Sequence, residues 1–100
     1  MSALTTEQIQ QVLPTLQKWS LKDDKRIERK YVFKEFLQGI SFVNELAQLS
    51  EEMNHHPFIT IKYKTVLVSL TSWSAKGLTQ TDFEMASKFE RIFSRMTSHS

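Results

Sequence analysis

The sequence contains no cysteine and has only two glycines and two prolines. The lack of cysteine excludes a disulfide framework, a thiolate zinc site and a cysteine nucleophile. It also fits a reducing compartment. Because glycine and proline are scarce, we expect the helices and strands to be joined by short connections.

Long apolar runs are also missing. No stretch approaches the roughly 20 apolar residues that a membrane-spanning helix needs. The first ten residues, MSALTTEQIQ, lack the cationic start and apolar run of a signal peptide. We therefore expect a soluble cytoplasmic protein without membrane association.

The charge pattern argues against a nucleic-acid-binding protein. The net charge is +2, and basic residues alternate with acidic ones, as in LKDDKRIERK. No basic recognition helix stands out, so no direct nucleic-acid partner is expected. The 100 residues, of which 40% are hydrophobic, suffice for one domain spanning residues 1–100 with a modest core.

The first third of the chain predicts a helix followed by a β-hairpin. Thr5 or Thr6 can cap the helix, and Pro14 should kink it or end it early. Residues 19–22 and 26–33 have extended character and flank the sequence DDK, which is typical of a turn. The side chains expected on the inward face of the second strand are Ile27, Arg29, Tyr31 and Phe33.

An amphipathic helix and a second hairpin are predicted next. The helix runs from Lys34 to about Asn54, and Gly39 should weaken it or let another residue pack closely. FITIKY and TVLVSLTS alternate in polarity and predict a hairpin with Lys64-Thr65 at its turn. The expected buried stripe of the helix consists of Phe36, Ile40, Val43 and Ala47, flanked by Leu37 and Leu46.

A last helix is predicted after Gly77, with Thr79 as its cap and Asp82 in its first turn. Its expected buried stripe consists of Phe83, Ala86, Phe89, Phe93 and Met96, with Ile92 beside it. The order is therefore α-β-β-α-β-β-α. This order predicts an α+β fold in which helices cover one face of a four-stranded antiparallel sheet.

Two of the three histidines, His55 and His56, are adjacent and are followed by Pro57. They lie between a helix end and a strand, where concave sites are common. An ordinary exposed loop is one interpretation. Acid–base chemistry near neutral pH is another, since imidazole can give or take a proton there. Metal binding is disfavoured, because neighbouring residues of an extended segment point to opposite sides.

A longer motif surrounds these histidines. In order, with fixed spacings, its residues are Glu51, His55, His56, Pro57, Tyr63, Trp73 and Asp82. With the flanking segments IERKYVFKEF and SAKGLTQTDFEMA, the motif resembles the signature of the pterin-4a-carbinolamine dehydratase family over roughly residues 27–93. Seven spaced positions are far more specific than a histidine pair alone.

The resemblance implies a hydro-lyase of tetrahydrobiopterin or tetrahydropterin recycling. Its substrate would be the 4a-hydroxytetrahydropterin left by a pterin-dependent aromatic amino-acid hydroxylase, and its products quinonoid dihydropterin and water. A base takes the proton of N5 and an acid protonates the departing hydroxyl, which suits histidine. The resemblance implies neither a cofactor nor a metal.

Residue roles carry over by position. His55 is implied as the principal acid–base residue, and His56 as a residue that binds the pterin and assists catalysis. Glu51 precedes His55 by one helical turn and is expected to orient that imidazole or favour its protonated form. Pro57 is implied as part of the substrate-binding loop. Asp82 is implied at the substrate site, with a plain helix N-terminal carboxylate as the alternative.

Trp73 stands where many members of the family have a third histidine. An indole can donate a hydrogen bond and contact a flat pterin, but it cannot act as an acid or base near pH 7. We therefore expect Trp73 to line the pterin pocket of a working but differently tuned enzyme. Tyr63 is expected to pack in the sheet.

A non-catalytic role is the alternative, because some members of this family are binding or assembly proteins, including a dimerisation cofactor for a homeodomain transcription factor. The retained unit ExxxHHP favours the enzyme. The resemblance also implies a homodimer or homotetramer formed by sheet extension and helix packing. Leu67 lies on the opposite sheet face from Val66 and Val68, and it is expected to be covered by another subunit.

Overall fold

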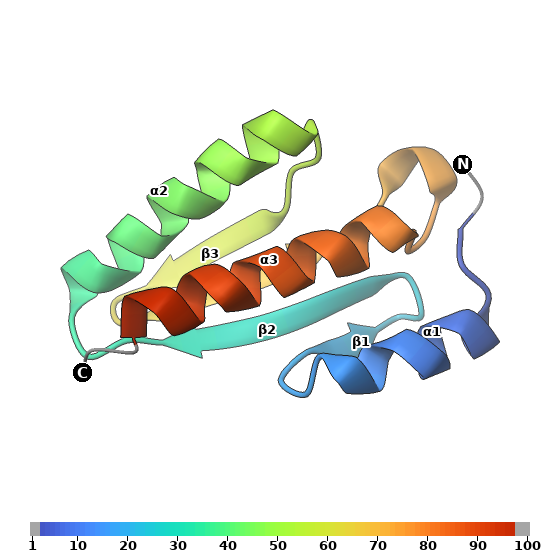
Figure 1. The fold of residues 1–100 in the computed structure, drawn as a ribbon, viewed down its shortest axis with the longest axis horizontal. Helices are drawn as coiled ribbons and strands as arrows, with labels where there is room; N and C mark the ends of the chain where they lie inside the picture. Colours follow the sequence, from blue (N-terminus) through green and yellow to red (C-terminus); the bar gives the residue numbers. More distant parts are fainter. Residues whose placement is uncertain (1–2, 98–100) are drawn as a thin grey trace.

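The computed structural model describes residues 3–97 and has the predicted element order (Figure 1). The elements of this range are α1 (Thr6–Val12), a 3₁₀ turn η1 (Leu13–Thr15), β1 (Ser20–Lys22), β2 (Arg26–Val32), α2 (Phe36–Met53), β3 (Phe58–Lys62), β4 (Thr65–Leu70), a second 3₁₀ turn η2 (Trp73–Ala75) and α3 (Gln80–Thr97). The helix and strand assignments made from periodicity are confirmed.

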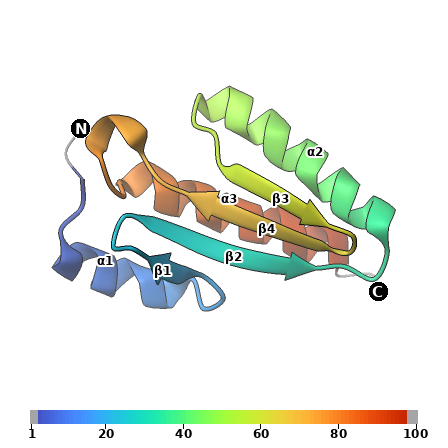
Figure 2. The same ribbon diagram turned by 180° about the vertical axis from the view of Figure 1, so that it is seen from behind.

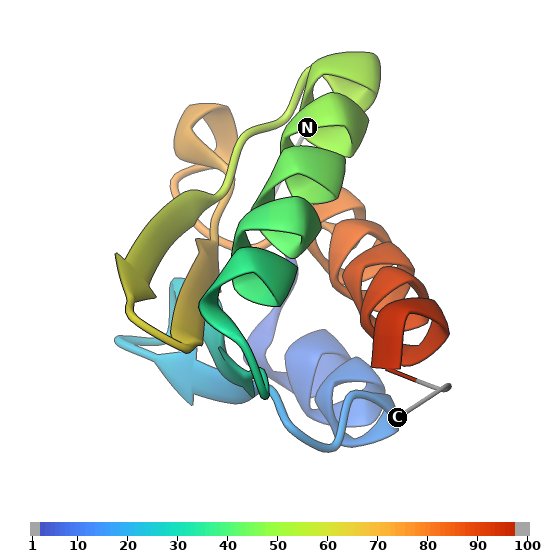
Figure 3. The ribbon, with the colours of Figure 1, turned by 90° about the vertical axis from the view of Figure 1, so that its left-hand side faces the viewer.

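The four strands form one antiparallel sheet in the order β1-β2-β4-β3 (Figure 2). The centre of the sheet is fixed in register by Val68, which pairs with Arg29 on one side and with Ile59 on the other. All three helices lie against the same face of the sheet, and the other face is left open (Figure 3). The predicted α+β fold is confirmed.

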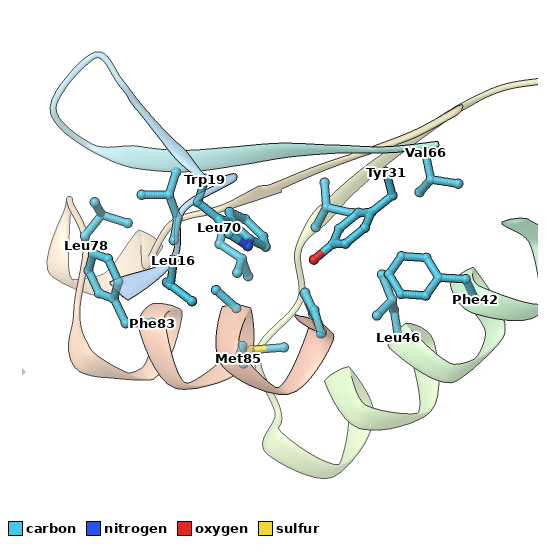
Figure 4. Packing of buried hydrophobic residues seen from close by; sticks show 14 of the residues in the cluster. Leu16, Trp19, Tyr31, Phe42, Leu46, Val66, Leu70, Leu78, Phe83 and Met85 are labelled. Atoms are coloured by element: carbon cyan, nitrogen blue, oxygen red, sulfur yellow. The ribbon is translucent and has the colours of Figure 1, made fainter. Parts of the chain in front are cut away.

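The core lies between the sheet and the helices. Alternate residues of the strands point into it, so Ile27, Tyr31 and Val68 have no exposed surface. Figure 4 shows Tyr31 of β2 facing Phe42 of α2, and the two ring centroids are 4.6 Å apart. From α3 the buried side chains are Phe83, Met85, Ala86, Phe89 and the carboxylate of Asp82.

The start of the chain follows its local signals. Thr5 caps α1 in a reciprocal capping box with Gln8. The α-helix ends at Val12, and Pro14 lies in the 3₁₀ turn that follows, as its missing N–H requires. At the β1–β2 turn, Asp23 adopts a positive φ of 56°, a conformation that aspartate tolerates.

The buried face of α2 differs from the predicted one. Phe36, Leu37 and Ala47 are exposed, whereas the residues that face the core are Gly39, Phe42, Leu46 and Ser50. The predicted row and the observed row both contain apolar residues, and the observed row also contains the small residues Gly39 and Ser50. A Cβ added at Gly39 would lie 3.3 Å from the Phe33 ring, so the glycine lets Phe33, the residue after β2, pack closely against the helix.

The β3–β4 turn is displaced by one residue from its predicted place. It is formed by Tyr63 and Lys64, and Tyr63 has a positive φ of 54°. Tyr63 does not pack within the sheet as expected. It is exposed and stacks on Phe36, with 6.3 Å between ring centroids.

A polar cluster within the core joins the sheet to α3. Glu90 Oε2 accepts hydrogen bonds from Trp19 Nε1 (3.1 Å), Arg29 (2.9 Å) and the Tyr31 hydroxyl. The Arg29 guanidinium also lies over the Tyr31 ring, 4.0 Å from its centroid. The charge predicted on the inward face of β2 is thereby paired.

Among residues 3–97, no helix combines the length and the apolar character needed to cross a membrane.

Candidate functional site

The α2–β3 connection and the β4–α3 connection lie at the same end of the sheet (Figures 1 and 2). Between them is an open pocket of about 500 Å³. Its walls include His55, His56, Pro57, Phe58, Trp73 and Thr79. The fold thus brings together both adjacent histidines and a tryptophan distant in sequence.

The histidine segment is held by the end of α2. Asn54 caps the helix in the left-handed conformation (φ 51°), which asparagine tolerates. The His55 N–H then donates to the carbonyl of Ser50 (3.1 Å), which reverses the chain direction. Pro57 follows and leads directly into β3. This local geometry fixes the backbone from which the two imidazoles diverge.

His55 contacts Asp82 at the start of α3. Its Nε2 lies 2.6 Å from Asp82 Oδ1. The His55 side chain is 18% exposed, and Asp82 is fully buried. Because a carboxylate accepts hydrogen bonds, Nε2 carries the proton, and Nδ1 has the lone pair when the ring is neutral. The carboxylate therefore selects the tautomer of an imidazole that borders the pocket.

The other oxygen of Asp82 is bound from two sides. Ser72 Oγ donates to Oδ2 over 2.7 Å, and the backbone N–H of Thr79 donates to it over 2.9 Å. Ser72 and Thr79 also share a hydroxyl hydrogen bond of 2.9 Å. Asp82 therefore closes the first turn of α3 and at the same time supports His55. It lies behind the imidazole rather than on the wall of the pocket.

His56 has a different environment. Its Nε2 lies 2.5 Å from Glu51 Oε2, and these two side chains are 56% and 78% exposed. The expectation that Glu51 orients His55 is wrong, because the reversal after Asn54 turns His55 toward α3 and leaves His56 beside α2. Each histidine thus has its own carboxylate, one buried and one at the surface.

Trp73 borders the same pocket as the two histidines. It begins η2, three residues after the last residue of β4, and its side chain is 73% exposed. Its ring meets the edge of Phe58, with 5.7 Å between centroids and an angle of 79°. The exposed indole face and the imidazoles provide flat and polar walls of the kind that bind heteroaromatic ligands.

The structure adds three residues that sequence reasoning did not place at the site: Phe58, Ser72 and Thr79. The sequence marks Thr79 only as a helix cap, and Ser72 is one of many serines without a motif. Their roles depend on the distance between the β4 end and the α3 start, which no local pattern encodes. Within residues 3–97, no three histidine or carboxylate side chains form a group suited to a metal ion.

Comparison with known proteins identifies the family. The family model described as pterin 4 alpha carbinolamine dehydratase matches residues 2–92. The chain belongs to this family. The resemblance noted from the histidine motif is confirmed.

Curated relatives of the family share this chain's length. A protein of Picosynechococcus sp. is 44% identical over 89 residues, which cover 89% of this chain and 96% of the relative. A protein of Sulfurisphaera tokodaii is 36% identical over 92 residues, covering 92% and 98%. Both bear the name "Putative pterin-4-alpha-carbinolamine dehydratase".

Two solved structures have the same fold. One, titled transcriptional coactivator/pterin dehydratase from Brucella melitensis, aligns with a TM-score of 0.87 at 30% identity, covering 91% of this chain and 98% of that one. The other, titled a pterin dehydratase-like RuBisCO assembly factor of the α-carboxysome, aligns with a TM-score of 0.66 at 20% identity, covering 76% and 89%. The second likeness concerns the fold alone.

Proposed function

We propose that this protein catalyses the dehydration of a 4a-hydroxytetrahydropterin to quinonoid dihydropterin and water. One observation carries the proposal: His55 borders an open pocket while its Nε2 is held 2.6 Å from the buried carboxylate of Asp82. The family to which the chain belongs provides the substrate class. By this proposal the protein acts in the cytoplasm, in the recycling pathway of a pterin-dependent hydroxylase.

The reaction needs one proton removed and one delivered. Nδ1 of His55 takes the proton from N5 of the pterin, and the electron pair of that N–H bond forms the N5=C4a double bond. The C4a–O bond breaks, and its electron pair leaves with the hydroxyl, which takes a proton from the imidazolium of His56 to give water. Atoms and charge balance without an oxidant or reductant. The imidazolium formed at His55 is stabilised by Asp82, as expected for an acid–base residue with a fixed orienting partner.

The other residues of the pocket bind the ligand in this proposal. His56, held at Glu51, hydrogen-bonds the polar edge of the pterin and serves as the second proton-transfer group. Pro57 and Trp73 contact the ring system, and Asp82 acts through His55. Trp73 cannot transfer protons, so the proton chemistry is assigned to the two histidines alone.

A stopped-flow absorbance assay tests the proposal. The 4a-hydroxy adduct is generated with a pterin-dependent hydroxylase, and its dehydration is followed with and without this protein. We expect a rate that increases in proportion to protein concentration. A dehydration rate equal to the uncatalysed one at every protein concentration would overturn the proposal.

Self-association is proposed as well. β3 lies at the edge of the sheet. Large apolar side chains are exposed on the strands, on α2 and at the β3–β4 turn; they are Val32, Phe36, Leu37, Phe58, Ile61 and Tyr63. Leu67 lies on the open sheet face and is partly exposed. Unpaired edges and apolar surface favour pairing with a second copy.

Light scattering should give a dimer or tetramer mass. A mass of one 11.7 kDa chain at micromolar concentration would contradict it.

A non-catalytic binding role is the second candidate. The titles of the two structural neighbours describe a transcriptional coactivator/pterin dehydratase and an assembly factor. In this chain, the same exposed apolar side chains favour such a role. The dehydration assay separates the two functions, because a pure binding protein gives no rate above background.

A further inference from the structure

A second pocket lies on the other side of Trp73. It encloses about 360 Å³ between the β1–β2 turn and the β4–α3 connection. Phe58, Ser72 and Trp73 border both this pocket and the histidine pocket. A ligand whose ring occupies the histidine pocket can therefore extend a substituent past Trp73 into the second one.

The second pocket has a positive charge surplus. Its charged lining consists of Asp23, Lys25, Arg26 and Lys76. Arg26 lies 3.5 Å from Asp23, so these two charges offset one another. Among residues 3–97, no carboxylate forms an ion pair with Lys25 or Lys76. Two ammonium groups thus remain free to bind an anion.

The two lysines are on loops that are joined to each other. Thr71 Oγ1 donates to the carbonyl of Lys25 over 2.5 Å, which ties the β1–β2 turn to the end of β4. The backbone of Lys76 has the left-handed conformation (φ 58°), and the backbone N–H of Lys76 donates to the Trp73 carbonyl over 3.2 Å. Trp73 and Lys76 are therefore fixed together by the backbone of η2.

The histidine pocket offers a different charge. Its lining contains no lysine or arginine, and the carboxylate of Glu51 lies next to His56. An anionic group on the ligand is consequently favoured on the lysine side of Trp73 and disfavoured on the histidine side. The two pockets together favour a ligand with a polar heteroaromatic ring at one end and a negative group at the other.

We propose that Lys25 and Lys76 form a subsite for a phosphate or carboxylate on the side chain of the pterin substrate. The inference rests on the proposed function and narrows its substrate class to pterins with an anionic side chain. Two partly exposed ion pairs together strengthen binding by up to about tenfold. The subsite contributes to affinity and specificity and takes no part in proton transfer.

Calorimetric titration of the full chain with three ligands tests the inference. Neopterin supplies the ring with a neutral side chain, neopterin 3′-monophosphate adds a phosphate, and pteroylglutamate carries carboxylates. We expect about tenfold tighter binding of the monophosphate than of neopterin, and a smaller difference at high salt. If pteroylglutamate is preferred instead, a carboxylate is the natural anion and the subsite stands.

The decisive variant is K25Q/K76Q, in which the preference for the anionic ligand should disappear while neopterin binds as in the wild type. The control variant K30Q/K62Q removes the same charge from exposed positions of β2 and β3, and it should retain the preference. The subsite proposal fails if the wild type binds all three ligands equally. It also fails if the preference for the anionic ligand survives in K25Q/K76Q. Either result leaves the proposed dehydratase function in place. If no pterin binds, the subsite and the proposed function both fail.

Discussion

α3 presents two carboxylates to the interior, eight residues apart, and they are used in opposite ways. Asp82 is fully buried, and one of its partners, His55, borders the pocket. Glu90 keeps 31% of its side chain exposed, while its donors Trp19, Arg29 and Tyr31 are buried. The partly exposed carboxylate of Glu90 accepts hydrogen bonds from donors that are buried in the core. The buried carboxylate of Asp82 instead binds His55, a titratable side chain that borders the pocket.

The comparison shows that a carboxylate bonded by several donors is not by itself a mark of function. The Glu90 cluster pairs a charge and satisfies two aromatic donors, which the fold requires wherever such groups are buried. The Asp82 cluster also closes a helix terminus, a structural task. The difference between the two clusters is that a partner of Asp82, His55, borders the histidine pocket and can exchange a proton with a ligand bound there.

Among the substitutions that compare the two carboxylates, the largest effect on the rate is expected from Asp82→Asn. The substitution keeps the shape but replaces an oxygen acceptor by a donor, so the His55 tautomer and orientation are lost. We expect the dehydration rate to fall roughly 10–100-fold, as is typical when an orienting partner is removed. The unfolding free energy should fall by about 1–3 kcal/mol. An Asp82→Asn protein with the wild-type rate would assign this carboxylate to structure alone.

Glu90→Gln is the matched change in the other cluster. It leaves Arg29 buried without its carboxylate, and we expect a loss of about 2–3 kcal/mol of stability in a denaturant titration. The dehydration rate per folded molecule should not change. Glu84→Gln, at an exposed position of the same helix, is the control and should leave both quantities near the wild type. A large loss of dehydration rate in Glu90→Gln would contradict the claim that the Glu90 cluster serves stability alone.

Tyr31 makes the Glu90 cluster sensitive to alkaline pH. Burial, and then the hydrogen bond to Glu90, raises the pKa of the Tyr31 hydroxyl above its ordinary value. The folded state thus holds this proton more tightly than the unfolded state. The Tyr31 hydroxyl therefore contributes its full stabilisation below about pH 10. Above that pH, the free energy of unfolding falls by up to about 1.4 kcal/mol per pH unit.

In Tyr31→Phe that alkaline loss of stability should become shallower, as measured by unfolding at pH 9, 10 and 11. The exposed Tyr63 provides the control, because Tyr63→Phe should keep the wild-type pH dependence. An unchanged alkaline slope in Tyr31→Phe would show that another group causes the loss.

The smallest effect is expected at Trp73, which borders the pocket without transferring protons. Binding of dihydropterin should quench its fluorescence, so quenching should persist in Trp19→Phe and disappear in Trp73→Phe. Trp19 is buried beside Glu90, away from the pocket. Trp73→His should keep the dehydration rate or raise it. Quenching that survives in Trp73→Phe and vanishes in Trp19→Phe would remove Trp73 from the pocket.

Local signals in the sequence were enough for the element order, the α1 cap and the alternation of β2. They failed on α2, where the small residues Gly39 and Ser50 face the core together with Phe42 and Leu46, because the space beside Phe33 that suits a glycine is not visible in the hydrophobic pattern. The β3–β4 turn was placed one residue too late, because it contains neither the glycine nor the asparagine that marks such turns.

At the site, the motif named His55, His56, Pro57 and Trp73, which line one pocket, but it did not give the pairing of the two histidines. Adjacent residues on an extended segment point to opposite sides, which argued against a metal shared by His55 and His56 but did not give the partner of either one. Which carboxylate each one meets depends on how the chain reverses at Asn54 and on where α3 begins. The role of Ser72 could not be predicted for the same reason, because it depends on the hydrogen bond that Ser72 makes to Asp82 in the folded protein.

The most direct test of the central claim is the dehydration rate of His55→Ala, measured beside His56→Ala in the same stopped-flow assay. Loss of a general acid–base group lowers a rate by about 10²–10⁴-fold. We expect a loss of that size at His55, a smaller one at the more exposed His56, and native circular dichroism for both. If His55→Ala dehydrates the carbinolamine as fast as the wild type, then His55 is not the proton-transfer residue, and the account of the Asp82 cluster is wrong.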